Sequence, residues 1–220
     1  PGPTLLSVEQ WGDVTWKSME YAFGLAASLK FNATDIPNLS GMTSMASMFE
    51  GATNFNSAIG HWDVSTITKM DYMFANTVFN QPIGLWDVSN ILNMRGMFVN
   101  NGIFNQDIGS WDVGAVEDMI SMFRNATAFN QDISGWNVSN VNRMQSMFAR
   151  AEAFNQNISG WDVTSVKDMV FMFDGAKAFD QNLGTWRLLG MTGEPNNIQK
   201  MLDGSGLSQA NYDATLIGWA

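Results

Sequence analysis

Apolar residues recur at fixed positions in a unit of 24 or 25 residues. With the first tryptophan as position 1, positions 9 and 12 are Met, positions 13 and 19 are Phe, and position 6 is apolar. Five clear copies begin at Trp62, Trp86, Trp111, Trp136 and Trp161, and a degenerate copy spans 37–61. A fixed period of about 20–50 residues is typical of stacked repeat arrays.

The apolar pattern of positions 6, 9, 12, 13 and 16 predicts a short helix in each copy. Offsets of 3, 6, 7 and 10 residues lie within an arc of about 120° at helical spacing. A hydroxyl residue at position 4 would be the N-cap: Ser65, Ser89, Ser139 and Thr164. We therefore expect a helix over positions 6 to 15.

Positions 20 to 23 have no helical period and predict a short strand. Each strand would pair in parallel with its equivalent in the next copy, and Pro82 at position 22 requires the strand to be brief. The expected fold is an α/β solenoid, with short parallel strands on one side, short helices on the other, and irregular caps.

The expected domain organisation is an N-terminal cap over 1–36, six repeats over 37–185 and a C-terminal cap over 186–220. Ser208 would cap a last helix that carries Tyr212, Leu216 and Trp219 at helical spacing.

The aromatic and Met positions are expected to form the core. A row of exposed Trp side chains would present on the order of 1,000 Å², more than a soluble monomer usually exposes in one patch. A row of sugar-stacking rings and a Met-rich docking face are the alternatives. The representative core residues are Trp86, Trp111, Trp136, Trp161, Met119, Met122, Phe123 and Phe129.

Asparagine at position 20 predicts a structural ladder, because one amide can serve the backbone of neighbouring coils. The alternative is a binding strip. The ladder residues are Asn80, Asn105, Asn130 and Asn155, with Asp180 after them.

Positions 21 and 22 form the candidate ligand-binding strip. Their polar side chains repeat at the spacing of the copies and could bind a periodic ligand such as a glycan; a solvated face is the alternative. The strip contains Gln81, Gln106, Asp107, Gln131, Asp132, Gln156, Asn157 and Gln181.

Aspartate at position 2 suggests calcium only weakly, since calcium needs about 6–8 converging oxygens. Local turn hydrogen bonds are the alternative reading for Asp63, Asp87, Asp112 and Asp162. We expect no cofactor and no catalytic residue. His61 is the single histidine, and a hydrolase with acids near Asp203 in the irregular segment 187–206 is the least favoured alternative.

The composition restricts the classes of partner that the chain can bind. The net charge is −10 without a Lys/Arg run, which argues against nucleic acid. There is no cysteine for a disulfide framework, and no stretch of 18 apolar residues for a membrane span. The opening PGPT and the abrupt end suggest a piece of a longer chain.

The sequence FNQDIGSWDV (104–113), together with the Met-x-x-Met-Phe motif, resembles the repeats of the BspA-type leucine-rich-repeat surface proteins of bacteria. The flanking segments 10–23 and 206–219 resemble that family as well. The resemblance implies a leucine-rich-repeat-like solenoid, secreted or displayed on the cell surface, which binds a glycan or a partner or host protein in adhesion. We expect a monomer. A structural spacer and a self-association module are the alternatives.

Overall fold

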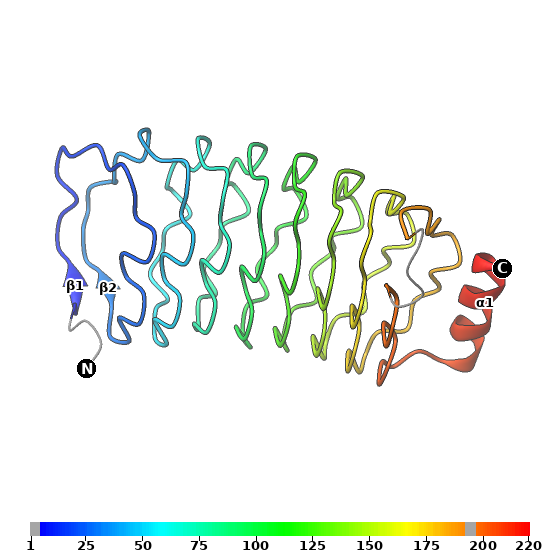
Figure 1. The fold of residues 1–220 in the computed structure, drawn as a ribbon. Helices are drawn as coiled ribbons and strands as arrows, with labels where there is room; N and C mark the ends of the chain where they lie inside the picture. Colours follow the sequence, from blue (N-terminus) through cyan, green and yellow to red (C-terminus); the bar gives the residue numbers. More distant parts are fainter. Residues whose placement is uncertain (1–4, 192–196) are drawn as a thin grey trace.

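The computed structural model describes residues 5–191 and 197–220. Two short strands, β1 (Ser7–Val8) and β2 (Lys30–Phe31), pair in parallel at the N-terminal end, with Ser7 opposite Lys30. One helix, α1 (Gln209–Trp219), lies at the C-terminal end. Between them, the chain forms a row of stacked coils built from turns and bends (Figure 1).

The predicted α/β solenoid is wrong. Across the described residues, the repeats contain neither a helix at positions 6 to 15 nor a strand at positions 20 to 23. The only α-helix of the described chain is α1, and its only strands are β1 and β2. Turns replace the predicted elements in each repeat.

Hydrogen bonding between repeats explains why the helix is missing. The backbone N–H groups at positions 9, 11, 13 and 15 donate to carbonyls at positions 8, 10, 12 and 14 of the next repeat. Met119 N donates to Arg143 O over 3.0 Å, and Phe123 N donates to Met147 O over 2.9 Å. An α-helix would need these donors for carbonyls four residues earlier in the same copy.

The other N–H groups of this segment close tight turns within the repeat. Met122 N donates to Met119 O and Ala126 N donates to Phe123 O, each spanning three residues. The third residue of each turn, Ser121 or Asn125, has a φ near +56°. A type II turn requires this left-handed conformation. The Met-x-x-Met-Phe spacing therefore serves successive turns, which bury the same side chains that a helix would.

Between the six repeats, parallel pairing occurs at position 8 and not at the predicted positions 20 to 23, where only β2 in the N-terminal cap is paired. Isolated bridges join this position through successive copies: Ser44, Lys69, Asn93, Asp118, Arg143 and Asp168. At position 20 the backbone N–H is used differently, because Asn130 N donates to the side-chain Oδ1 of Asn105 over 2.9 Å. A side chain thus occupies the donor that a strand ladder would need.

Columns of stacked aromatic rings form the core. Phe98 and Phe123 stack across neighbouring repeats with ring centroids 5.6 Å apart, and Phe123 and Phe129 stack within one repeat at 3.9 Å. The indole N–H of Trp111 donates to Ile83 O over 3.1 Å. The core thus buries large apolar surfaces while the indole donor remains paired.

The stack continues beyond the last repeat that the sequence identifies. Met169 N donates to Asn197 O and Gly175 N donates to Asp203 O, each over 2.8 Å, as in the earlier copies. Residues 197–204 therefore form one more set of stacked turns. The sequence analysis predicts only a C-terminal cap here, although Ile198, Met201 and Leu202 keep the spacing of Met-x-x-Met-Phe.

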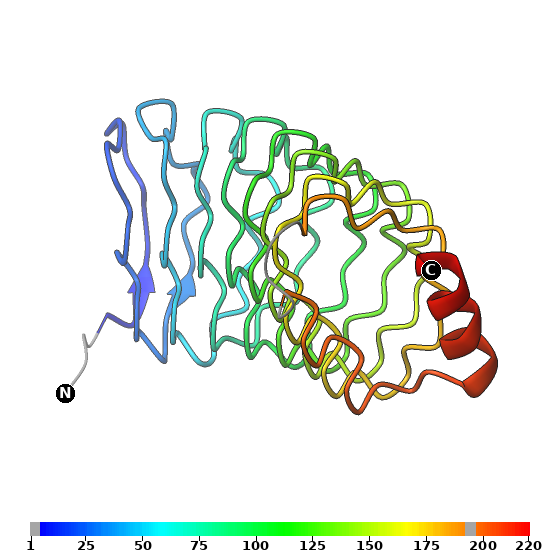
Figure 2. The same cartoon turned by 45° about the vertical axis from the view of Figure 1, so that its right-hand side comes forward.

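Helix α1 closes the C-terminal end, with Ser208 as its N-cap. Asn211 donates its side-chain Nδ2 to Asp180 O, and Trp219 donates its indole N–H to Leu183 O. Both bonds reproduce those that a glutamine and a tryptophan make in the ordinary repeats. The helix therefore makes the side-chain contacts that the next coil would make in the middle of the stack. Figure 2 shows α1 at the C-terminal end of the row of coils. No helix in the described ranges is long and apolar enough to cross a bilayer.

The core assignment can be tested at Met122, which is fully buried between two coils. Replacing Met122 with Asp should cost about 3 kcal/mol or more, because an unpaired carboxylate enters an apolar interior. Thermal unfolding followed by circular dichroism measures the loss, with Met122→Leu as the size-matched control. An unchanged melting temperature for Met122→Asp would show that this position is not core.

Candidate functional site

The asparagine column at position 20 joins the repeats through its side chains. Asn105 Oδ1 accepts hydrogen bonds from Asn130 N at 2.9 Å and from Gln131 Nε2 at 2.9 Å. The same arrangement recurs down the stack and ends at Asp180, whose Oδ1 accepts from Ser208 N at 2.8 Å. Each amide carbonyl thus bonds to the backbone and the glutamine of the next copy. The members are Asn80, Asn105, Asn130 and Asn155.

The predicted ligand strip is engaged in hydrogen bonds within the molecule, except at the half-buried Gln81, whose side chain bonds to no described residue. The half-buried glutamines at position 21 lie against the preceding asparagine, and Gln106, Gln131, Gln156 and Gln181 each donate Nε2 to it. The exposed residues at position 22 accept from the backbone two residues later: Asp107, Asp132, Asn157 and Asn182. A ligand at this strip would have to compete with these bonds.

The aspartates at position 2 stabilise local turns. Asp63 Oδ1 accepts from Ser65 N at 3.0 Å and from Ser65 Oγ at 2.6 Å, and Asp112 accepts from Gly114 N at 3.0 Å. The hydroxyl and backbone hydrogen bonds lower the pKa values of Asp63, Asp87 and Asp162. Within the described residues, no three side chains of His, Cys, Asp or Glu gather as metal ligands.

Part of the segment 187–206, which was suggested as the place of a hydrolase site, extends the stack of coils. Residues 192–196 lie outside the described residues, and Asp203 accepts a backbone hydrogen bond from Gly175. His61 lies exposed on the surface of the degenerate copy, as part of a turn.

The bridge face at positions 8 and 10 carries both signs of charge. Arg143 forms an ion pair with Asp118 at 3.0 Å, and Arg95 donates Nε to the hydroxyl of Tyr72. Burial raises the pKa of Asp71 on the same face. Because these charges largely engage each other, the face does not present one sign to a partner.

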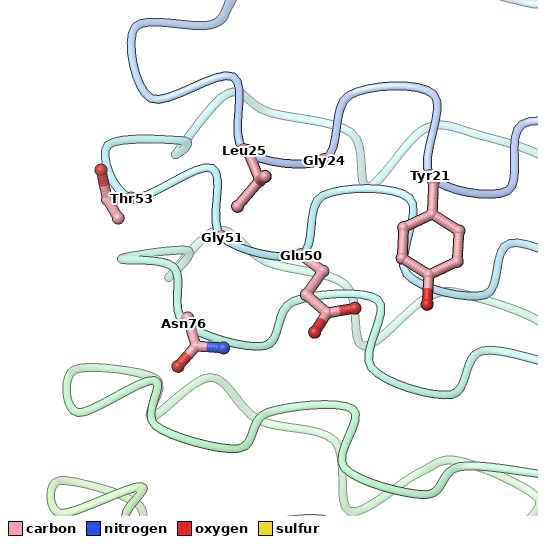
Figure 3. Close-up of a pocket in the computed structure, with 7 residues that line it drawn as sticks. All are labelled: Tyr21, Gly24, Leu25, Glu50, Gly51, Thr53 and Asn76. Carbon is pink, nitrogen blue, oxygen red and sulfur yellow. The ribbon is translucent and has the colours of Figure 1, made fainter. Parts of the chain in front are cut away.

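A hollow near the N-terminal end is the most distinct concave site. It has a volume of about 520 Å³, and three successive coils line it, with Tyr21 and Leu25 on the first, Glu50 on the second and Asn76 on the third. Figure 3 shows these side chains over the backbone of Gly24 and Gly51. Volumes of roughly 300–1,000 Å³ are usual for small-molecule sites.

Turn geometry places the apolar side chains of the hollow on the surface. Tyr21 and Leu25 occupy positions 11 and 15 of a first coil counted from Trp11, with φ values of 55° and 61°. The same left-handed conformation occurs at Tyr72, Arg150 and Phe171, so it belongs to the repeat. Tyr21 and Leu25 are about two-thirds exposed, at 67% and 66%.

The polar groups of the hollow are available to a ligand. Glu50 forms no ion pair with any described residue. Asn76 accepts from Asn100 Nδ2 at 2.8 Å through Oδ1, and its amide nitrogen lies on the side of Glu50 (Figure 3). The hollow therefore combines an aromatic ring, an aliphatic side chain, a carboxylate and an amide.

The repeat pattern alone does not reveal this hollow. Position 11 is occupied by Tyr21, Ser47, Tyr72, Gly96, Ser121, Ser146 and Phe171, and position 15 by Leu25, Gly51, Asn76, Asn100, Asn125, Arg150 and Gly175. Among these copies, the first carries a large apolar residue at both positions. The consequence depends on knowing that both positions are left-handed, which the helix interpretation concealed.

Comparison with known proteins gives one match. A family model described as "Mycoplasma protein of unknown function, DUF285" matches residues 17–120 and 100–214. No curated protein matches the chain, and no solved structure matches it.

The glutamine column can be tested at Gln131, whose Nε2 donates to both Asn105 O and Asn105 Oδ1. In Gln131→Glu, a carboxylate would face two acceptors, and the free energy of unfolding should fall by about 1–2 kcal/mol. Chemical denaturation measures this. The matched control is Asp132→Asn, which keeps the acceptor for Ser134 N and should unfold as the parent does. If Gln131→Glu were as stable as the parent and as Asp132→Asn, the Gln131 side chain would lie in solvent and contribute no hydrogen bond to stability.

The turn aspartates predict a pH dependence. Because the folded pKa values of these aspartates lie below the ordinary value of 3.8, their carboxylates contribute stability above that pH and lose it as the pH falls through the folded pKa. Replacing Asp63, Asp87 and Asp162 with Asn should flatten the fall of the melting temperature between about pH 5 and pH 2.5. Asn137 already makes the same turn bonds, so the variant should fold. If the melting temperatures of the parent and the triple variant fell in parallel with pH, these aspartates would not stabilise the turns.

Proposed function

The chain belongs to the DUF285 family, and from this premise we propose that it is a non-enzymatic binding module of a BspA-type bacterial surface protein. In this proposal it is secreted or displayed at the cell surface, and it binds a saccharide in the N-terminal hollow. The observation that carries the proposal is the exposed Tyr21 ring beside the unpaired carboxylate of Glu50.

The chemistry of the hollow suits a sugar. The face of an aromatic ring packs well against the apolar C–H face of a pyranose, because both surfaces are flat and lose water on contact. Hydroxyl groups at the rim of the sugar can donate to Glu50 and accept from the amide of Asn76. Leu25 would cover the remaining apolar edge. A neutral or cationic sugar fits this site better than an acidic one, since the net charge of the chain is −10.

The rest of the surface supports a binding role at this hollow more than along the repeats. The polar columns at positions 2, 20, 21 and 22 make hydrogen bonds within the stack. Their recurrence is explained by stacking, because each copy must offer the same groups to its neighbours. In the hollow, Asn76 Oδ1 accepts from Asn100 in the same way, but Glu50 forms no ion pair with any described residue and Tyr21 and Leu25 are largely exposed.

A glycan array tests the proposal. The labelled chain should give a saturable signal for a restricted set of neutral saccharides, with calcium and with chelator alike. In Tyr21→Asn the affinity should fall at least about tenfold, the loss of one good stacking contact. Asparagine tolerates the left-handed backbone, so this change removes the ring without adding strain. Glu50→Gln should lose part of the affinity.

Tyr212 provides the matched control, because it is an exposed tyrosine on α1 at the opposite end. Tyr212→Ala should bind as the parent does. Equal losses in Tyr21→Asn and Tyr212→Ala, or an empty array, would exclude the hollow as a saccharide site. A signal that requires calcium would point instead to the aspartate column.

A further inference from the structure

The hydrogen bonds between the turns at positions 8 to 15 have the same direction along the whole stack. In the inner repeats, the N–H groups at positions 9, 11, 13 and 15 donate toward the C-terminal neighbour, and the carbonyls at positions 8, 10, 12 and 14 accept from the N-terminal neighbour. Within this segment, every interface therefore has a donor edge on one coil and an acceptor edge on the next. Elsewhere in the coils a few backbone bonds run the other way, as from Glu117 N to Leu92 O. The segment of positions 8 to 15 must therefore differ between the two ends of the row.

At the N-terminal end, the turns of this segment present carbonyl acceptors. Its first turns span residues 18–25, and their N–H groups already donate to the second coil, as Tyr21 N does to Ala46 O. Among the described residues, no backbone N–H donates to the four carbonyls on the outer edge: Ser18, Glu20, Ala22 and Gly24.

At the C-terminal end, the turns of this segment present N–H donors. Its last turns span residues 197–204, whose carbonyls accept from the preceding coil. Lys200 and Gly204 have φ values of 54° and 63°, so this segment repeats the left-handed pattern of the inner turns. Within the described ranges, four N–H groups on its outer edge donate to no backbone carbonyl: Ile198, Lys200, Leu202 and Gly204.

We infer that the donor edge of one molecule pairs with the acceptor edge of a second copy, head to tail. The inner interfaces give the register, in which Ile198, Lys200, Leu202 and Gly204 donate to Ser18, Glu20, Ala22 and Gly24 in that order. Two identical ends cannot pair, since acceptors would face acceptors. The contact is therefore heterologous, which lets it continue into longer rows.

Charge agrees with this register. It brings Lys200 of one molecule beside Glu20 of the other, so opposite charges meet at the contact. The donor end also exposes apolar side chains. A groove of about 450 Å³ runs between the donor edge and α1, and Leu202, Tyr212, Leu216 and Trp219 line it.

This pairing replaces the monomer that the sequence analysis expects, and it is independent of saccharide binding. Backbone edges left open are a recognised cause of association between copies. Here each open edge matches the other end of the same chain. The charged residues beside the edges make the contact specific for opposite ends.

The experiment blocks one end at a time in the full chain. Ala22→Arg places a long side chain over the acceptor edge, and Leu216→Arg fills the groove beside the donor edge. Both parent residues are exposed, so both variants should keep the parent circular dichroism spectrum and melting temperature. Sedimentation velocity over a range of concentrations up to roughly 1 mM, where weak contacts are occupied, measures association.

The parent chain should show a mass that rises with concentration, through the dimer to longer rows. Each variant alone should stay a monomer, with its dimer dissociation constant raised at least about tenfold. An equimolar mixture should form a one-to-one dimer that grows no further, because each variant keeps one intact end. The charge-exchanged pair, Glu20→Lys with Lys200→Glu, should also associate better as a mixture than either variant alone.

Three results would overturn the inference. A parent chain that remains a monomer over the whole range excludes the contact. A blocked variant that associates as well as the parent places the contact elsewhere. Folded variants that stay monomeric after mixing exclude the head-to-tail geometry.

Discussion

The hydrogen bonds between successive turns at positions 8 to 15 are the constraint on which the rest of this structure depends. Four N–H groups of each coil donate to four carbonyls of the next. They can do so because positions 11 and 15 are left-handed, which directs alternate peptide groups along the stack axis. Where these positions hold Gly or Asn, the conformation is inexpensive. Where they hold Tyr21 and Leu25, the stack imposes it and presents the side chains to solvent.

The core follows from the same spacing. Coils held in register bring identical side chains into contact, so phenylalanine rings stack in columns about 5.6 Å apart. The Met residues at positions 9 and 12 fill the space around the rings and are fully buried. A side chain that suits one coil suits all of them, and this is why the copies resemble each other so closely. Repetition in this chain is thus explained by stacking before any ligand is considered.

Function is then expected where the repetition stops. In the repeated part, the polar columns satisfy the backbone and each other, and the charged bridge face pairs its own groups. At the ends, one neighbour is missing, so side chains and backbone groups remain available. The saccharide proposal and the head-to-tail proposal both depend on groups that the stack does not use. They concern different atoms, since the first involves side chains of a lateral hollow and the second involves the backbone at both ends.

Several features followed from the sequence alone. The period, the apolar positions and the last helix with Ser208 as its N-cap could be derived, because burial and capping depend on residue type and spacing. The local path of the chain could not. Offsets of three and four residues place the same side chains inward in a helix and in successive tight turns, so the apolar pattern does not distinguish the two.

Only the tertiary structure decided between them. The energetic gain of the turns comes from hydrogen bonds to residues about 25 positions away, such as Met119 to Arg143, and no local pattern reports a partner at that distance. The same reason concealed the hollow, whose walls come from three coils, and the place in the stack of residues 197–204, which keep only the apolar spacing of the repeat. The sequence determined which side chains are buried; the contacts between coils determined the backbone that buries them and the groups left free at the ends.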